Sequence, residues 1–218
     1  FVRAVLVAKL HAREVWVGPD FRFGHRRGGD VALLQRMGAE LGFATHALPL
    51  VENAGERVSS TAVRAALAKG ELDRAAVLLG RPYAIPGRVV RGKQLGRTLG
   101  YPTANLRFGG KRPPMHGIFA TWVHGVGDRP MASVSSLGTR PTVNGKEPLL
   151  EAHLFDFNGD LYGRRISVEF VAKLRDELKF DGLPALIEQM DRDSAEARAI
   201  LAGRASAGHP QPVSLTTP

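Results

Sequence analysis

The side chains best suited to chemistry lie in a segment of glycine and basic residues, 87–105. It reads Gly-Arg-Val-Val-Arg-Gly-Lys-Gln-Leu-Gly-Arg-Thr-Leu-Gly-Tyr-Pro-Thr-Ala-Asn and contains no carboxylate. No Asp or Glu occurs anywhere between Asp73 and Asp128, whereas basic residues recur there: Arg74, Arg81, Arg88, Arg91, Lys93, Arg97, Arg107, Lys111 and Arg112. A segment with this charge is suited to an anionic ligand such as a nucleotide phosphate.

The glycines of this segment do not form a phosphate-binding loop of the P-loop type. Gly87-x4-Gly92-Lys93 matches that pattern up to its last position, which is Gln94 instead of Ser or Thr. The missing hydroxyl is the group that ligates Mg²⁺ in such loops, and Arg-Val-Val-Arg is typical of a strand. We therefore predict a strand at 87–91 and a flexible basic flap at 92–100.

Thr103 and Asn105 are candidate metal ligands. Tyr101-Pro102 favours an extended chain, and alternate residues of a strand share a face, so Thr103 and Asn105 would present two neutral oxygens together. Mg²⁺ bound to nucleotide phosphates takes only one or two protein oxygens. On composition alone, a basic hairpin with a surface Thr and Asn explains the same pattern.

The motifs resemble a known family. Residues 87–106, Gly-x-Val-Val-x-Gly through Leu-Gly-Tyr-Pro-Thr-Ala-Asn-Leu, resemble the riboflavin kinase signature, and the similarity continues through 150–163 and 174–180. Gly18-Pro-Asp-Phe-Arg-Phe-Gly24 and Ser59-Ser-Thr-Ala-Val-Arg64 are similar to the adenylyltransferase half of bacterial bifunctional riboflavin kinase/FAD synthetases. The resemblance covers about residues 1–203. It implies that the substrates are the small molecules riboflavin, FMN and ATP, and that Mg²⁺ accompanies the ATP.

The resemblance also assigns roles to residues. It implies that the flap and the Pro-Thr-Ala-Asn segment bind ATP and its phosphates through Gly92, Lys93, Arg97, Gly100, Thr103 and Asn105. Thr103 and Asn105 would hold the metal. It places Arg175 in a flap on the flavin side, although a charge cluster at a helix start is the alternative. The catalytic glutamate of the family falls on Glu151.

From the pattern alone, Glu151 is either a general base or the partner of an arginine. Alternation along an expected strand at 149–157 puts Glu151, His153, Phe155 and Phe157 on one face. A lone His on an apolar strand face is usually packed and hydrogen-bonded, so we do not assign His153 as the base. Asp156 and Asp160 are interpreted as turn or capping residues.

The order of elements predicts an α/β plus β chain. Elements that alternate between helix and strand indicate parallel strands in residues 1–82: helix 1–10, strand 14–18, helix 31–41 capped by Asp30, strand 43–51, helix 61–69 and helix 71–79. Six short strands separated by turn signals then predict a closed barrel: 87–91, 103–107, 117–124, 131–137, 149–157 and 165–171. An amphipathic helix is expected at 183–201.

The resemblance turns this order into domains. It implies the C-terminal half of a Rossmann-like nucleotidylyltransferase domain at 1–82, then a six-stranded antiparallel riboflavin kinase barrel with a C-terminal helix at 83–203. Residues 204–218 are expected to be a disordered tail. Because the chain opens with a helix instead of a strand and lacks an initial Met, we expect its first part to be missing.

The first 82 residues carry a candidate phosphate site. This site consists of Ser59, Ser60, Thr61 and Arg64 at a helix start, where free amides favour anions. The resemblance adds Asp20, Phe21 and Phe23 of the Gly18–Gly24 loop as further residues of the adenylyltransferase half. An ordinary Ser cap with a solvated Arg is the alternative. The adenylyltransferase family uses a His-x-Gly-His motif for ATP that is absent among the seven histidines here, so this chain alone is not expected to make FAD.

Composition sets limits on function. The absence of cysteine excludes disulfides and fits a reducing cytosol, and no apolar run approaches the ~20 residues of a membrane span. We therefore expect a cytoplasmic enzyme without a membrane partner. A net charge of +9 also suits nucleic acid, so a basic barrel that binds single strands is the main alternative, but few aromatic residues accompany the cations. A catalytically silent flavin-binding module is a third possibility.

Overall fold

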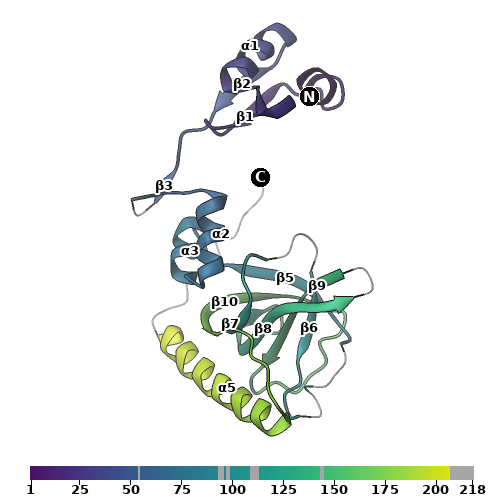
Figure 1. Cartoon of the computed structure of the whole chain (residues 1–218), viewed down its shortest axis with the longest axis vertical. Coiled ribbons are helices and arrows are strands. Elements are labelled where there is room, and N and C mark those ends of the chain that lie inside the picture. Colours follow the sequence, from purple (N-terminus) through teal and green to yellow (C-terminus); the bar gives the residue numbers. More distant parts are fainter. Residues whose placement is uncertain (54, 93–95, 97–98, 109–112, 143–144, 207–218) are drawn as a thin grey trace. The chain divides into compact units, whose positions relative to one another are not determined.

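The structure is a computed structural model that describes residues 1–53, 55–92, 96, 99–108, 113–142 and 145–206 (Figure 1). The chain forms two compact units, Phe1–Val58 and Ser59–Pro218, and each is described by itself. Lys93 and Arg97 of the predicted phosphate-binding flap lie outside the described residues.

The first unit is a small α/β arrangement. Its elements are the π-helix η1 (Val2–Val7), β1 (Glu14–Val17), the 3-10 helix η2 (His25–Arg27), α1 (Val31–Leu41), β2 (Ala44–Ala47), β3 (Glu52–Asn53) and β4 (Glu56–Arg57). Strands β1 and β2 pair in parallel, as predicted. Helix α1 begins after Asp30, whose Oδ1 accepts a hydrogen bond of 2.8 Å from the Leu33 amide, and it ends at Gly42, where φ is 82°.

Two elements of this unit are shorter than expected. The opening helix covers Val2–Val7 instead of 1–10. The strand expected at 43–51 is confined to β2, because its partner β1 ends at Val17, whose carbonyl accepts the Leu48 amide at 2.8 Å. Beyond that bond Leu48, Leu50 and Val51 are exposed.

The second unit contains the closed barrel that the sequence predicts. Neighbouring strands are antiparallel in the order β10-β5-β6-β9-β8-β7. The strand bounds are β5 (Ala84–Val90), β6 (Ala104–Arg107), β7 (Gly117–His124), β8 (Met131–Thr142), β9 (Gly145–Leu154) and β10 (Arg165–Arg175). Gly87 and the Arg-Val-Val that follows it lie inside β5, so the first part of the segment that matches a P-loop is strand, as expected.

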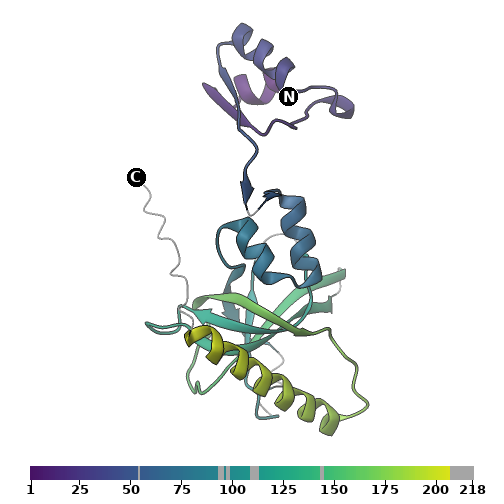
Figure 2. The same cartoon turned by 90° about the vertical axis from the view of Figure 1, so that its left-hand side faces the viewer.

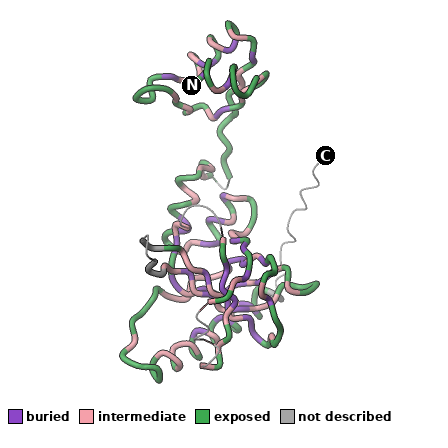
Figure 3. The backbone as a smooth tube through the Cα atoms, turned by 90° about the vertical axis from the view of Figure 1, so that its right-hand side faces the viewer, coloured by how far each residue is buried: buried purple, intermediate pink, exposed green. Residues whose placement is uncertain are grey.

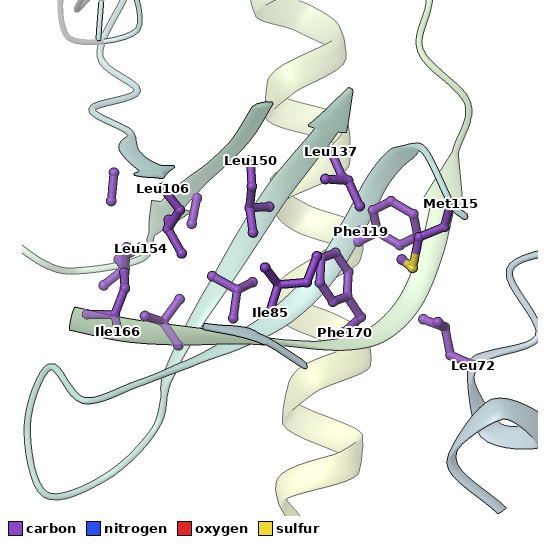
Figure 4. Close-up of a cluster of buried hydrophobic side chains, with 14 of the residues drawn as sticks. Leu72, Ile85, Leu106, Met115, Phe119, Leu137, Leu150, Leu154, Ile166 and Phe170 are labelled. Carbon is purple, nitrogen blue, oxygen red and sulfur yellow. The ribbon is translucent and has the colours of Figure 1, made fainter. Parts of the chain in front are cut away.

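Two short helices precede the barrel and share its core. These are α2 (Ser60–Lys69) and α3 (Leu72–Leu79), and each ends at a glycine with positive φ. The barrel interior is filled by large apolar side chains, among which the rings of Phe119 and Phe170 meet edge to face at 5.1 Å (Figure 4). Ala66, Leu67, Leu72 and Ala75 of the two helices belong to the same buried cluster.

This packing differs from the domain boundary that the sequence places between residues 82 and 83. The compact units divide at Val58 and Ser59 instead, because α2 and α3 bury their apolar faces against the barrel. Figure 3 shows the buried positions that run from these helices into the strands. The division between functional domains stays a prediction.

The C-terminal helix α5 (Leu183–Ser206) lies along the outside of the barrel (Figure 2). It packs on β7, β8 and β10, and its buried residues Ala197 and Leu201 contact Ala120 and Phe155. The disordered tail expected at 204–218 does not include residues 204–206, which are helical. Nη2 of Arg204 donates to both carboxylate oxygens of Asp73 on α3, at 2.8 and 2.9 Å. Residues 207–218 lie outside the described part of the chain.

Candidate active site

Two cavities adjoin the Pro-Thr-Ala-Asn segment. The first, of about 500 Å³, lies between the outer face of β6, β9, β8 and β7 and the helix α5, and Glu177, Leu178 and Phe180 also line it. Its wall is largely apolar, formed by Leu99, Ile118, Val134, Leu149, Leu178, Phe180, Leu186 and Met190. The second, of about 710 Å³, lies between the ends of β5 and β6 and the loop 157–162. Thr103 lines both cavities, so the two cavities adjoin at this residue.

Asn105 and Glu151 form the polar centre of the first cavity. They lie directly opposite each other on the paired strands β6 and β9, so their side chains share one face. Asn105 is buried, with 7% of its surface exposed, and Glu151 is half-buried. Thr103 precedes Asn105 by two residues and lines the same cavity. The structure therefore brings the two predicted metal ligands and the predicted base together.

The glycines of the flap allow close approach of the backbone. A Cβ at Gly92 would lie 2.5 Å from Oδ1 of Asn105, so only glycine permits the chain to pass the amide at this distance. Gly96 accepts the Tyr101 amide at 2.7 Å, and Gly100 has a φ of 83° in the turn between them. Gly92 is thus adjacent to the predicted metal ligand, whereas Gly100 shapes the turn.

The expected alternation along 151–157 holds only in part. Glu151 and His153 line the first cavity, and Phe155 packs beneath α5. Phe157, expected on the same face, instead lines the second cavity and packs against the barrel core. The alternation fails because β9 ends at Leu154 and Asp156 adopts a left-handed φ of 56°. Asp156 is a turn residue, as expected.

His153 and Tyr101 hold the start of the Pro-Thr-Ala-Asn segment. His153 Nδ1 lies 2.9 Å from the Pro102 carbonyl oxygen, and its ring centroid is 5.1 Å from that of Tyr101. The Tyr101 hydroxyl donates a hydrogen bond to Oδ1 of Asp191 on α5. Burial and the neighbouring Asp191 carboxylate raise the pKa of the Tyr101 hydroxyl. His153 is packed and hydrogen-bonded, as predicted.

Arg175 forms part of the cavity wall. Its Nε and Nη2 donate to the carboxylate of Asp193 at 2.9 and 2.6 Å, and Gln189 Nε2 donates to the same carboxylate at 2.8 Å. The guanidinium carbon also lies 5.9 Å from the centre of the Phe180 ring. Arg175 lines the first cavity, and its charge is compensated by the Asp193 carboxylate. Its place on the flavin side stays a prediction.

Comparison with known proteins identifies the family. The riboflavin kinase model matches residues 79–201, more than half of the chain. This chain belongs to the riboflavin kinase family. The FAD synthetase model matches residues 1–62.

Relatives of this chain are named as bifunctional enzymes. The bifunctional riboflavin kinase/FMN adenylyltransferase of Escherichia coli K12 is 46% identical over 198 residues, which cover 91% of this chain and 63% of that protein. The protein of the same name from Haemophilus influenzae is 41% identical over 199 residues, covering 91% and 65%. The chain thus spans less than two thirds of the length of these relatives.

A solved structure has a similar fold. The crystal structure described as a macrolide-efflux protein from Streptococcus pneumoniae has a TM-score of 0.67 and 31% identity, covering 90% of this chain and 64% of the other.

Among the residues that the structure describes, no helix is long and apolar enough to cross a membrane.

The residues predicted in the FAD synthetase region lie in separate units. In the first unit, Asp20 accepts a hydrogen bond of 2.8 Å from Arg57 Nη2, and this contact lowers the pKa of the Asp20 carboxyl. The Phe21 and Phe23 rings stack with their centroids 5.8 Å apart.

In the second unit, Ser59 caps α2 by accepting a hydrogen bond of 3.1 Å from the Ala62 amide, and Arg64 donates to the Ser60 carbonyl at 3.3 Å. Ser60 and Thr61 open α2. Phosphate binding by Ser59, Ser60, Thr61 and Arg64 stays a prediction.

Sequence reasoning missed the acidic residues of α5. Asp191 and Asp193 hold Tyr101 and Arg175, which come from positions 90 and 18 residues earlier in the chain. No local pattern marks these pairs, because each depends on how α5 docks on the barrel.

Proposed function

We propose that this chain transfers the γ-phosphate of ATP to the 5′-hydroxyl of riboflavin and so makes FMN. The observation that carries this proposal is that Asn105 and Glu151, cross-strand neighbours, line the first cavity together with Thr103, which also lines the second cavity. The two cavities differ in character. The apolar first cavity suits a flat aromatic flavin. The second cavity, lined by polar groups that include Arg91, Asn158 and Asp160, suits a nucleotide.

The residues fit a metal that accompanies the nucleotide. The described residues include no group of three or more His, Asp or Glu that could hold an ion by themselves, but Thr103 and Asn105 offer two neutral oxygens. Such a pair suits Mg²⁺, which takes its other ligands from phosphate and water. Thr103 and Asn105 would hold Mg²⁺, and the bound ion supplies positive charge against the phosphates.

The chain's own residues would position the reactants and move one proton. Glu151 accepts the proton of the riboflavin 5′-hydroxyl as the oxygen bonds to the γ-phosphorus, while the bond to the β,γ-bridging oxygen breaks and ADP leaves. The apolar wall and Arg175 hold the flavin. Gly92, Lys93, Arg97 and Gly100 stay in the proposal as contacts to ATP and its phosphates.

The nucleic-acid alternative receives limited support. Arg165, Arg88 and Arg107 lie opposite one another on the adjacent strands β10, β5 and β6, and all three are exposed. Nonspecific single-strand binding also uses exposed aromatic platforms. The aromatic residues of the basic segment are buried or half-buried: Tyr83, Tyr101, Phe108, Phe119 and Trp122. We therefore favour small-molecule substrates, and a cytoplasmic location stays a prediction.

Adenylyl transfer is proposed only for the longer relatives, whose names include FMN adenylyltransferase. Because the sequence of this chain contains no His-x-Gly-His motif, we propose that it makes FMN without converting it to FAD.

One assay tests both proposals. The purified chain is incubated with riboflavin, ATP and Mg²⁺, and the flavins are separated by HPLC, with an EDTA-treated reaction as control. We expect FMN and ADP in equal amounts and no FAD. Absence of FMN would refute the kinase, whereas sustained FAD and pyrophosphate from added FMN would show that this chain performs adenylyl transfer.

A further inference from the structure

We propose that His153 is a positioning residue for phosphoryl transfer, which holds the Pro102–Thr103 peptide so that Thr103 presents its hydroxyl at the junction of the two cavities. The proposal rests on the proposed kinase function, since Thr103 is assigned there to the metal and nucleotide. It gives His153 a role distinct from that of the base Glu151.

The first argument is the end of the strand pairing. Strands β6 and β9 pair at Leu106 with Leu150, Asn105 with Glu151 and Ala104 with Ala152. The next pair in this register would be Thr103 with His153, but β6 begins at Ala104. Pro102 has no amide hydrogen to donate, so the backbone ladder cannot continue through it. The segment that carries Thr103 therefore needs another attachment to β9.

The His153 side chain supplies that attachment. Its Nδ1 lies 2.9 Å from the carbonyl oxygen of Pro102. A carbonyl only accepts hydrogen bonds, so Nδ1 must carry the hydrogen. A side-chain hydrogen bond thus extends the connection between β9 and the Pro-Thr-Ala-Asn segment by one step beyond the backbone pairs.

The imidazole is itself held on two sides. Its centroid lies 5.1 Å from the Tyr101 ring and 5.7 Å from the Phe155 ring, which it meets edge to face. Phe155 is buried beneath α5, with the Arg198 guanidinium carbon 4.2 Å from its ring centre. Because the ring contacts hold the imidazole in place, its Nδ1 holds the Pro102 carbonyl. The orientation of the Pro102–Thr103 peptide, and with it the position of Thr103, is thereby set.

Two substitutions separate the hydrogen bond from the bulk of the ring. In His153→Asn the side-chain amide nitrogen occupies roughly the place of Nδ1 and can still donate to Pro102. In His153→Gln the amide reaches toward the place of Nε2, so the bond to Pro102 is lost although a polar side chain of similar size remains. Comparing the two therefore tests the hydrogen bond to Pro102.

Steady-state kinetics give kcat, the KM for MgATP and the KM for riboflavin. Riboflavin affinity is measured from the quenching of flavin fluorescence, and the melting temperature shows whether each variant is folded. For His153→Gln we expect kcat to fall roughly 10- to 100-fold and KM for MgATP to rise, because small misplacements of reacting groups are costly in rate. Riboflavin affinity should fall by a smaller factor than kcat, because His153 is one lining residue of the first cavity and the apolar lining residues are unchanged. His153→Asn should recover most of kcat.

Wild-type turnover in the same assay tests the kinase proposal separately. If the wild type makes FMN and His153→Gln is equally active, the positioning role is refuted. Equal losses in Asn and Gln variants would also refute it, because the bond to Pro102 would not explain them. A Gln variant that loses riboflavin and MgATP affinity together with its melting transition would show a structural residue, and would overturn the proposal too.

Discussion

Asn105 of β6 and Glu151 of β9 are direct cross-strand neighbours, and Ser136 of β8 continues the same row on the other side of Glu151. Both contacts are set by the register of a closed antiparallel barrel. A one-residue slip would turn these side chains to the opposite face, so the barrel fixes the pairing of the proposed metal ligand with the proposed base.

Glu151→Gln should abolish most kinase activity while riboflavin still binds. The amide keeps the shape of the side chain but cannot accept the proton, and loss of a general base costs roughly 10²- to 10⁴-fold in rate. Turnover is measured by HPLC and riboflavin binding by fluorescence. Glu147→Gln, an exposed position on the same strand, is the control. If Glu151→Gln kept a third or more of wild-type turnover, Glu151 would have no part in the mechanism.

Thr103→Ala and Asn105→Ala should each weaken binding of MgATP far more than binding of metal-free ATP. Their proposed role is to hold the ion against the phosphates, so the loss should depend on the ion. Isothermal titration with and without Mg²⁺ measures the difference. Equal losses in both titrations would mean that the two side chains only support the fold.

Asp193→Ala should destabilise the protein by about 3–5 kcal/mol, because it leaves the largely buried guanidinium of Arg175 without its carboxylate. The side chains of this pair are only 18% and 6% exposed. Glu188→Ala on the same helix is the control, because its pair with Arg192 is exposed and such pairs contribute about 1 kcal/mol or less. Urea unfolding gives both values, and similar losses in the two variants would contradict the prediction.

Asp156→Asn should lower the melting temperature near neutral pH but not in acid. Two hydrogen bonds from Arg198 lower the pKa of the Asp156 carboxyl, so its stabilisation is present above the unfolded pKa and is lost as the pH falls through the folded value. Asn tolerates the left-handed backbone at this position, where φ is 56°. Melting curves are compared from neutral pH to below pH ~4, the unfolded value. If the two proteins still differed as much in melting temperature at the lowest pH, the charge of Asp156 would not be the source of the stabilisation.

The sequence predicted those features that depend on neighbouring residues. Asp30 caps α1 and Ser59 caps α2, because N-capping is set within one helical turn. Barrel strands were likewise found from alternation and turn residues. Phe157 was misplaced because one left-handed residue, Asp156, reverses the alternation, and a strand pattern does not reveal such a residue.

Features that depend on docking were not predicted. The attachment of Tyr101 to Asp191 and of Arg175 to Asp193 requires α5 to lie along the barrel, which no local pattern specifies. The sharing of one core by α2, α3 and the barrel is a similar case, since a proline-punctuated connector follows α3 and looked like a boundary.

That shared core decides where the chain can be shortened. A truncated kinase starting at Tyr83 would discard Ala66, Leu67, Leu72 and Ala75 and uncover the barrel surface on which they pack. An exposed apolar patch of this kind favours aggregation. Starting at Ser59 retains both helices and the serine cap of α2. Soluble expression of a minimal kinase should therefore require the 25 residues from Ser59 to Tyr83 upstream of the first barrel strand, which begins at Ala84.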